Sequence, residues 1–158
     1  MLTAEKKSMW RGQYRMVADG REVAQWDPSW WRTGGDFEVD GHRFSVRANA
    51  WGNRFKMIDE SGGEVARVER AGRKNWSVHA GGLVYEFRRT SLWGNQQELL
   101  SAGVKVGSLR RTSAWSGGVE ADLPGMPLPI QIFVVGVQIA MWQAQQAAAA
   151  SSSGGSGG

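Results

Sequence analysis

The sequence contains no cysteine, and this absence excludes both a disulfide framework and a thiolate metal site. Residues 1–20 carry Lys6, Lys7, Arg11 and Arg15 but no apolar run behind these charges, so we expect no secretory signal peptide. A chain that gains nothing from an oxidising compartment suits a reducing one. We therefore predict a cytoplasmic protein, for which a position peripheral to the membrane is also open.

Histidine is scarce as well, with only His42 beside a predicted turn and His79 in a predicted strand. Neither histidine belongs to a nucleophile elbow, a phosphate-binding loop or a metal-ligand spacing. A pair of carboxylates could assemble from Glu86, Glu98 or Asp122, but no motif indicates it. We therefore predict that the protein is not an enzyme and has no catalytic residue, metal ligand or cofactor.

Tryptophan and glycine are abundant, with 9 and 22 copies in 158 residues. Aromatic residues favour strands and glycine interrupts helices, so the composition favours a mainly β protein. A chain of this length has room for one domain of about 150 residues and no second one. We place this single domain at residues 1–150, followed by a disordered Ser/Gly tail at residues 151–158.

Four predicted hairpins follow one another between residues 36 and 111. In the first, residues 37–39 meet residues 44–46 across Asp40-Gly41, a dipeptide that supplies the positive φ angles of a tight hairpin. The other three join residues 55–58 to 65–68, 76–78 to 83–87, and 98–100 to 104–106. The turn centres recur about every twenty residues, as in meandering sandwiches and barrels.

The N-terminal part has a weaker pattern. Residues 1–20 show no clear period, so we expect an irregular entry to the domain and one strand at Glu22 to Trp26. The run from Trp26 to Gly35 contains proline and paired glycines and is typical of a loop.

The C-terminal part has no charged residue from Leu123 onward, and the run from Ile130 to Trp142 is apolar apart from two glutamines. Pro127 and Pro129 suit the start of a helix, which the following alanines extend to Ala150. Thirteen residues span about 20 Å as a helix, which is short of the roughly 30 Å hydrocarbon core. We therefore predict a helix buried in protein and no transmembrane span, with a membrane span as the alternative.

Apolar side chains cover almost the whole circumference of this predicted helix, so it needs partners on nearly all sides. A narrow polar stripe remains at Gln131, Gln138 and Gln145, which should face a gap or hydrogen-bond partners. An antiparallel sheet curled into a closed β-barrel supplies the enclosure. A helix that fills the barrel also leaves little room for a polar cavity that could hold an unrecognised active site.

The order of elements resembles that of a known family. The resemblance is carried by GDFEVDGHRF (35–44), IDESGGEVARV (58–68), LVYEFRR (83–89) and ADLPGMPLPIQIF (121–133). These segments look like those of the LURP-one-related proteins, which belong with the tubby C-terminal domain and the phospholipid scramblases, and the similarity covers about residues 25–145. It implies a tubby-like barrel of about twelve strands around a central apolar C-terminal helix. Tubby-like domains bind phosphoinositides and scramblases act on bilayers, so the resemblance also suggests an anionic lipid partner. However, no tubby-type headgroup motif maps onto this sequence residue by residue. The acidic calcium segment and palmitoylated cysteines of scramblases are missing as well, so lipid transport is not implied.

Positive charge is concentrated in residues 43–111, which hold thirteen basic and six acidic residues. We predict that an anionic ligand binds Arg70, Arg73, Lys74, Arg88 and Arg89, because the hairpin order brings these strand ends to one rim. Each basic side chain near an anionic bilayer contributes about 1 kcal/mol. The opposing interpretation is that the basic residues of this region, which also include Arg67, Arg110 and Arg111, are solvated and offset by Glu69 and Glu86.

The tryptophans allow two roles. Those in or beside predicted loops could insert at a membrane interface, stack on bases or cover a barrel mouth: Trp30, Trp31, Trp51 and Trp93. Those expected in the core are Trp76, Trp115 and Trp142. The main hypothesis is a non-enzymatic binding or scaffold domain that docks on anionic phospholipid. The alternative is a nucleic-acid-binding β-barrel that uses the basic central surface, and the oligomeric state is left open.

Overall fold

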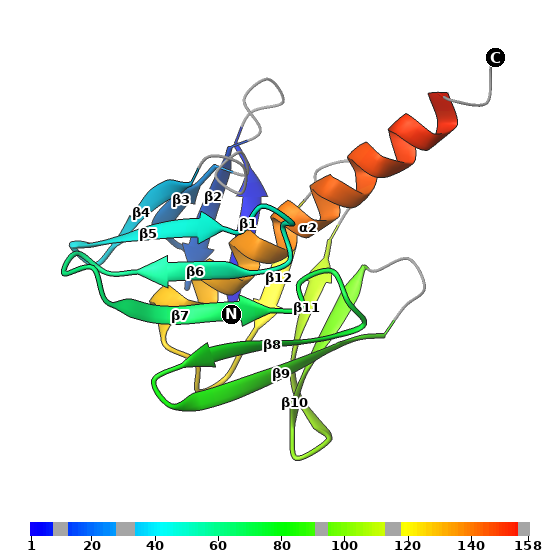
Figure 1. Ribbon diagram of the computed structural model, residues 1–158. Coiled ribbons are helices and arrows are strands. Elements are labelled where there is room, and N and C mark those ends of the chain that lie inside the picture. Colours follow the sequence, from blue (N-terminus) through cyan, green and yellow to red (C-terminus); the bar gives the residue numbers. More distant parts are fainter. Residues whose placement is uncertain (8–12, 28–33, 91–94, 113–117, 155–158) are drawn as a thin grey trace.

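The computed structural model describes residues 1–7, 13–27, 34–90, 95–112 and 118–154 (Figure 1). It contains a mainly β domain with one long C-terminal helix, α2 (Leu128–Gly154). The strands are β1 (Leu2–Lys6), β2 (Tyr14–Ala18), β3 (Arg21–Trp26), β4 (Gly35–Val39), β5 (His42–Ala48), β6 (Phe55–Ile58), β7 (Glu64–Glu69), β8 (Asn75–Ala80), β9 (Leu83–Arg89), β10 (Gln96–Ser101), β11 (Val104–Arg111) and β12 (Val119–Asp122).

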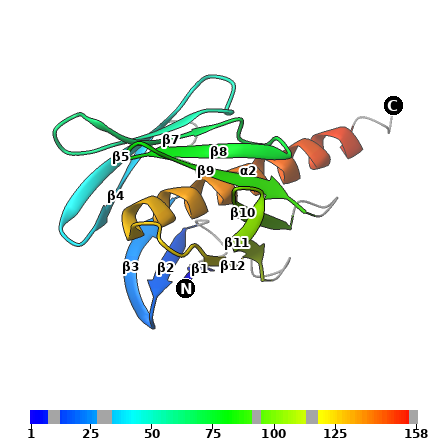
Figure 2. The ribbon, with the colours of Figure 1, turned by 90° about the horizontal axis from the view of Figure 1, so that it is seen from below.

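The strands form one 12-stranded antiparallel sheet in the order β3-β2-β1-β12-β11-β10-β9-β8-β7-β6-β5-β4. The sheet curls around α2 into a nearly closed barrel (Figure 2). Among the described residues no backbone ladder joins the edge strands β3 and β4. Their seam is bridged by side chains, since the ring centroids of Trp26 and Phe37 lie 5.7 Å apart. The predicted antiparallel barrel around an apolar C-terminal helix is thus confirmed, with aromatic packing at its seam.

All four predicted hairpins are present. In the β4–β5 hairpin Asp40 and Gly41 have φ angles of 51° and 78°, which is the left-handed pair that a type I′ turn requires. The resulting register sets Phe37 opposite Phe44. The other three hairpins are β6–β7, β8–β9 and β10–β11.

The irregular entry predicted for residues 1–20 is wrong, because β1 and β2 lie in this segment and β3 follows them. Leu2 and Ala4 of β1 are buried, but an alanine at an inward position gives little hydropathy contrast in the sequence. The partner strand of β1 is also distant, since Leu2 pairs with Ala121 of β12. Of the predicted loop at residues 26–35, Trp26 ends β3 and Gly35 begins β4, and residues 28–33 lie outside the described part.

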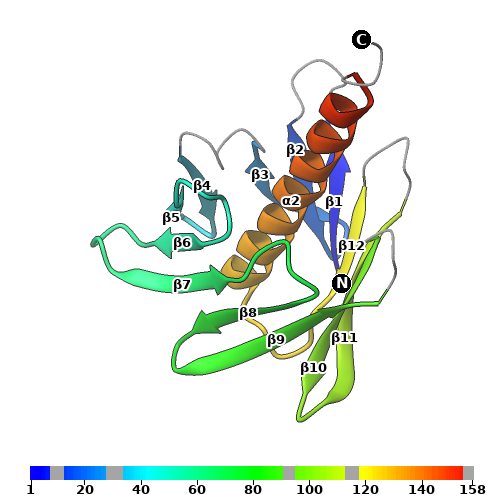
Figure 3. The same ribbon diagram turned by 45° about the vertical axis from the view of Figure 1, so that its right-hand side comes forward.

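The helix occupies the barrel as predicted. Residues 132–142 are all buried, and the side chains of Ile132, Phe133 and Val134 have no exposed surface. The C-terminal end of the helix projects from the barrel (Figure 3), and residues 143–151 are half-buried or exposed. The helix continues past the predicted boundary at residue 150 to Gly154. Within the described residues, no helix has both the length and the apolarity that a bilayer crossing requires.

The glutamine stripe of α2 meets three different environments. Near the start of the helix, the Nε2 atom of Gln131 donates a hydrogen bond to the carbonyl oxygen of Met126 over 2.7 Å. Gln138 is buried in the barrel, whereas Gln145 is exposed on the projecting part. The expectation that the stripe faces hydrogen-bond partners is therefore confirmed at Gln131.

Candidate functional site

The two ends of the barrel carry different charged residues. Because neighbouring strands are antiparallel, the odd-numbered strands all end at the rim from which α2 emerges, which we call the exit rim. The opposite end, the turn rim, consists of the tight hairpin turns. Every charged residue within these described turns is acidic: Asp19, Asp40, Asp59 and Glu60. Aspartate is favoured in such turns for its local hydrogen bonds and its tolerance of left-handed φ, so turn chemistry explains the three aspartates. The Glu60 carboxylate instead accepts a hydrogen bond from the backbone N–H of Arg43 over 2.8 Å.

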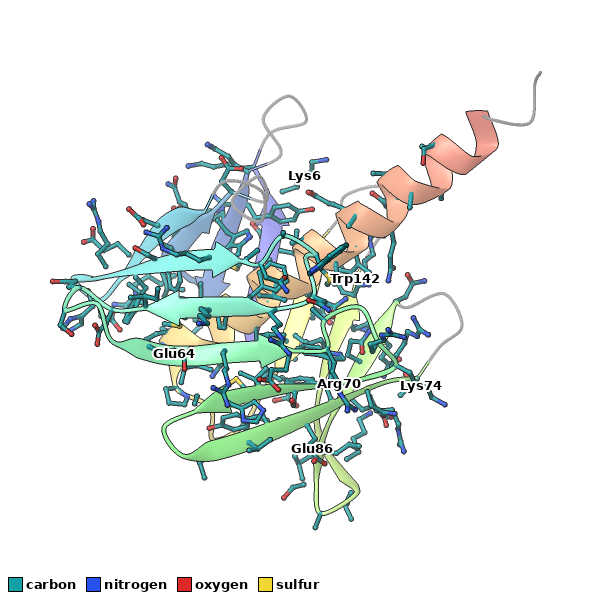
Figure 4. The ribbon with its side chains drawn as sticks, viewed as in Figure 1. Lys6, Glu64, Arg70, Lys74, Glu86 and Trp142 are labelled. Atoms are coloured by element: carbon teal, nitrogen blue, oxygen red, sulfur yellow. The ribbon has the colours of Figure 1, made fainter. Side chains whose placement is uncertain are left out.

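The exit rim has the opposite character. Its described connections carry Asp27 and five basic residues: Lys7, Arg54, Arg70, Arg73 and Lys74. Figure 4 shows Arg70 and Lys74 toward this rim and Glu64 toward the other end of β7. No turn geometry calls for arginine or lysine, so the local conformation does not account for these cations as it does for the turn-rim aspartates.

Three of the predicted binding residues lie together in the connection between β7 and β8. Arg70, Arg73 and Lys74 are exposed, and none forms a salt bridge with an acidic residue in the described part of the chain. The connection is closed by a 3.0 Å hydrogen bond from the Arg73 backbone N–H to the Arg70 carbonyl. The backbone N–H of Arg89, at the end of β9, donates to the Lys74 carbonyl over 2.8 Å, so Arg89 adjoins this group.

Arg88 does not join this group. Neighbouring residues of a strand point to opposite faces, and Phe87 and Arg89 share the inward direction while Arg88 points outward. There the Nη2 atom of Arg88 lies 3.1 Å from Oε2 of Glu98 on β10. Its charge is therefore offset, as the opposing interpretation proposed, although by Glu98 instead of Glu69 or Glu86.

Two further arginines of the basic region are offset in the same way. Arg67 lies 3.4 Å from Glu69, and Arg110 lies 2.6 Å from Glu120. The predicted offset by Glu69 is thus found at Arg67. Among the described residues, the cations at the strand connections of the exit rim form no such salt bridge, and the same holds for other exposed cations such as Arg21, Arg43 and Arg47.

Arg111 has a structural role at the mouth of the barrel. Its guanidinium carbon lies 5.8 Å from the centroid of the Trp142 ring. With the amide of Gln146 turned so that its oxygen faces Arg111, this oxygen accepts from Nη2 over 2.8 Å and from Nη1 over 3.1 Å. On the same helix, Gln143 shares a hydrogen bond with the Tyr14 hydroxyl, and burial raises the pKa of Tyr14. These contacts hold α2 where it leaves the barrel.

The loop between β5 and β6, residues 49–54, lies beside these basic residues and adds to them. The sequence analysis did not predict that it belongs to the site. The Ala71 backbone N–H donates to the Asn53 carbonyl over 3.0 Å, which brings this loop beside the β7–β8 connection. The loop adds Arg54, which is exposed, and Trp51, whose side chain is 88% exposed. We call residues 49–54, residues 70–74 and Arg89 together the basic corner. The order of the hairpins already places the β5–β6 and β7–β8 connections at the same rim. This order was therefore sufficient to predict that residues 49–54 lie at the rim of the basic residues.

Of the other tryptophans, Trp76 and Trp142 are buried as predicted. Trp30, Trp31, Trp93 and Trp115 lie outside the described residues.

An arrangement for nucleophilic catalysis would need a base that contacts the nucleophile through one nitrogen and its orienting acid through the other. Within the described ranges, the nearest approach to such an arrangement is at Ser77, whose Oγ lies 3.2 Å from Nε2 of His79. The Glu69 carboxylate lies 3.9 Å from the same nitrogen, so the three groups do not form a relay. Among the described residues no cluster of acids and histidines could hold a metal ion.

An open groove of about 360 Å³ lies beside the basic corner, on β7, β8 and β9. Arg70 lines one side of it, but Glu69 and Glu86 line it as well. Two carboxylates oppose the binding of an anion, so the groove does not extend the basic corner as an anion site.

Comparisons with known proteins found no matching family, no matching curated protein and no matching solved structure. The function must therefore be inferred from the chemistry of the barrel surface.

Proposed function

We propose that the protein is a non-enzymatic docking domain that binds anionic phospholipid surfaces through its basic corner. The observation that carries this proposal is the gathering of Arg54, Arg70, Arg73, Lys74 and Arg89 at one corner, without a carboxylate partner among the described residues. Each basic side chain near an anionic bilayer contributes about 1 kcal/mol. A group of this size is sufficient for reversible attachment.

The backbone at Arg70 supports a role for its side chain. Arg70 has a φ angle of 60°, in the left-handed region that costs a non-glycine residue roughly 1–2 kcal/mol. Glycine or asparagine would fit this position with less strain. The strained backbone under a long cationic side chain motivates the hypothesis that the Arg70 side chain has a function.

The resemblance to the LURP-one-related and tubby-like proteins supports the same proposal, because the barrel has the element order that this family implies. The negatively charged leaflet of the plasma membrane faces the cytoplasm. We accordingly place the protein in the cytoplasm, at the membrane surface when it is bound. Nucleic acid is the alternative anionic ligand for the same basic residues, and the experiments below distinguish it from phospholipid.

Vesicle flotation tests the proposal. Wild-type protein should float with vesicles that contain phosphatidylserine, should not float with pure phosphatidylcholine, and should be released as salt rises. Arg73→Glu/Lys74→Glu should abolish flotation. The matched control is Arg21→Glu/Arg43→Glu, which makes the same change in charge at exposed positions near the turn rim and should float normally.

A fluorescent oligonucleotide titrated over the same salt range separates the two polyanions. Tight oligonucleotide binding without flotation would favour the nucleic-acid alternative. Equal loss of flotation in both double variants would mean that net charge, and not the basic corner, governs attachment.

A further inference from the structure

We propose that Trp51 is the membrane anchor of the basic corner, with its indole in the bilayer interface while the neighbouring cations contact lipid headgroups. This inference rests on the proposed function. Trp51 is 88% exposed, whereas Trp26, Trp76 and Trp142 are 3%, 5% and 4% exposed in the core. Tryptophan prefers the boundary between headgroups and acyl chains, where its ring is shielded and its N–H remains in a polar zone.

The loop that carries Trp51 is held in one shape. The Oδ1 atom of Asn49 accepts hydrogen bonds from the backbone N–H groups of Asn53 and Arg54, each over 3.1 Å. The Asn49 carbonyl accepts from the Gly52 N–H over 3.1 Å, which closes the turn around Trp51. A ring presented by a pre-ordered loop loses less conformational entropy on binding than one on a free segment.

The cations lie where an inserted ring would need them. Arg54 follows Trp51 in the same loop, and the hydrogen bond from Ala71 to Asn53 fixes the loop beside Arg70, Arg73 and Lys74. Both connections lie at the right-hand ends of strands β5 to β8 in Figure 1. An exposed ring at a loop tip lies here beside cations that have no carboxylate partner in the described part of the chain. This arrangement is complementary to a fluid anionic surface with an apolar layer beneath it.

Trp51→Ala tests the anchor. The indole has a surface of roughly 200 Å², and insertion should bury about half of it. Loss of this apolar burial should lower the partition coefficient onto phosphatidylserine vesicles by about tenfold to a hundredfold. The matched control is Leu83→Ala, which truncates another exposed apolar side chain, 60% exposed, near the turn rim. It should partition as wild type does. Both variants should unfold at the wild-type denaturant midpoint.

Binding to a polyanion that has no apolar layer distinguishes insertion of the Trp51 ring from attraction by the basic side chains. On immobilised heparin, Trp51→Ala should elute at the same salt concentration as wild type, because its cations are intact. If wild type fails to bind vesicles, the proposed function falls. If wild type binds and Trp51→Ala binds equally well, only the anchor is refuted. Equal weakening on vesicles and heparin would also refute the anchor, since the ring would then act through the charged side chains.

Discussion

Replacing Gly136 with alanine tests the packing of the helix inside the barrel. Gly136 lies in the buried stretch of α2, and a Cβ atom built there would overlap the Trp26 ring at its Cδ2, Cε2 and Cζ2 atoms. The ring has little freedom to move away, because Trp26 is buried and its other contacts include Phe37 across the seam. The helix therefore requires the absence of a side chain at this position.

Two opposing contributions set the magnitude. Alanine is favoured over glycine inside a helix by about 1 kcal/mol. Overpacking a filled core costs typically 1–3 kcal/mol, and a rigid ring wedged between helix and seam places this site at the upper end, about 3 kcal/mol. We expect Gly136→Ala to lower the free energy of unfolding by about 2 kcal/mol, which corresponds to a fall in Tm of roughly 4–8 °C.

Urea unfolding followed by far-UV circular dichroism measures this change. Trp26→Phe provides the matched background, because its smaller ring should leave room for the added methyl group. In that background Gly136→Ala should be close to neutral or stabilising, so the double-mutant cycle should show strong coupling between the two positions. A stabilisation of about 1 kcal/mol in the wild-type background would mean that the ring does not lie against the helix, and would refute the packing.

Three further changes test other parts of the structure. Arg111→Met should lower the free energy of unfolding by about 1–2 kcal/mol, because it removes the contact with the Trp142 ring, and hydrogen exchange should quicken in the projecting part of α2. Tyr14→Phe should cost about 1 kcal/mol at neutral pH through the lost hydrogen bond to Gln143, as measured by urea unfolding. Because burial raises the pKa of Tyr14 in the folded state, the stability it contributes is complete below its unfolded-state pKa of about 10 and is lost as pH rises through the folded-state value. The variant should therefore lose less stability than wild type above about pH 10, and parallel curves would contradict the burial of this hydroxyl. Arg70→Gly should leave stability unchanged or raise it by up to about 1 kcal/mol, since it relieves a left-handed φ angle, yet weaken vesicle binding about fivefold. A clear loss of stability in this variant would show that the Arg70 side chain has a structural role.

The parts of the fold that follow from local chemistry could be predicted from the sequence. Asp40-Gly41 specifies a type I′ turn by its backbone preferences, and the uncharged run from Ile130 to Trp142 requires enclosure because apolar surface surrounds it. Strand β1 could not be predicted in this way. The inward residues of β1 differ little in hydropathy from its outward residues. Its partner strand β12 also lies near the opposite end of the chain.

The candidate site shows the same division. Hairpin order was sufficient to bring Arg70, Arg73 and Lys74 to one rim with Arg89. The period of two along β9 could also have separated Arg88 from Arg89, but its ion pair with Glu98 depends on the register with β10. The exposure of Trp51 depends on the shape of its loop beside the β7–β8 connection, which only the folded structure reveals.

The absence of cysteine allows a direct measurement of which end of the barrel faces the bilayer. A cysteine introduced at Ala50, exposed beside Trp51, or at Ser101, exposed beside the β10–β11 turn, can carry a spin label without any competing thiol. On phosphatidylserine vesicles, the label at position 50 should gain contact with oxygen dissolved in the bilayer and lose contact with a water-soluble relaxation agent. The label at position 101 should remain in water. Immersion of the label at position 101, or water around both labels in protein that has bound the vesicles, would contradict docking through the basic corner.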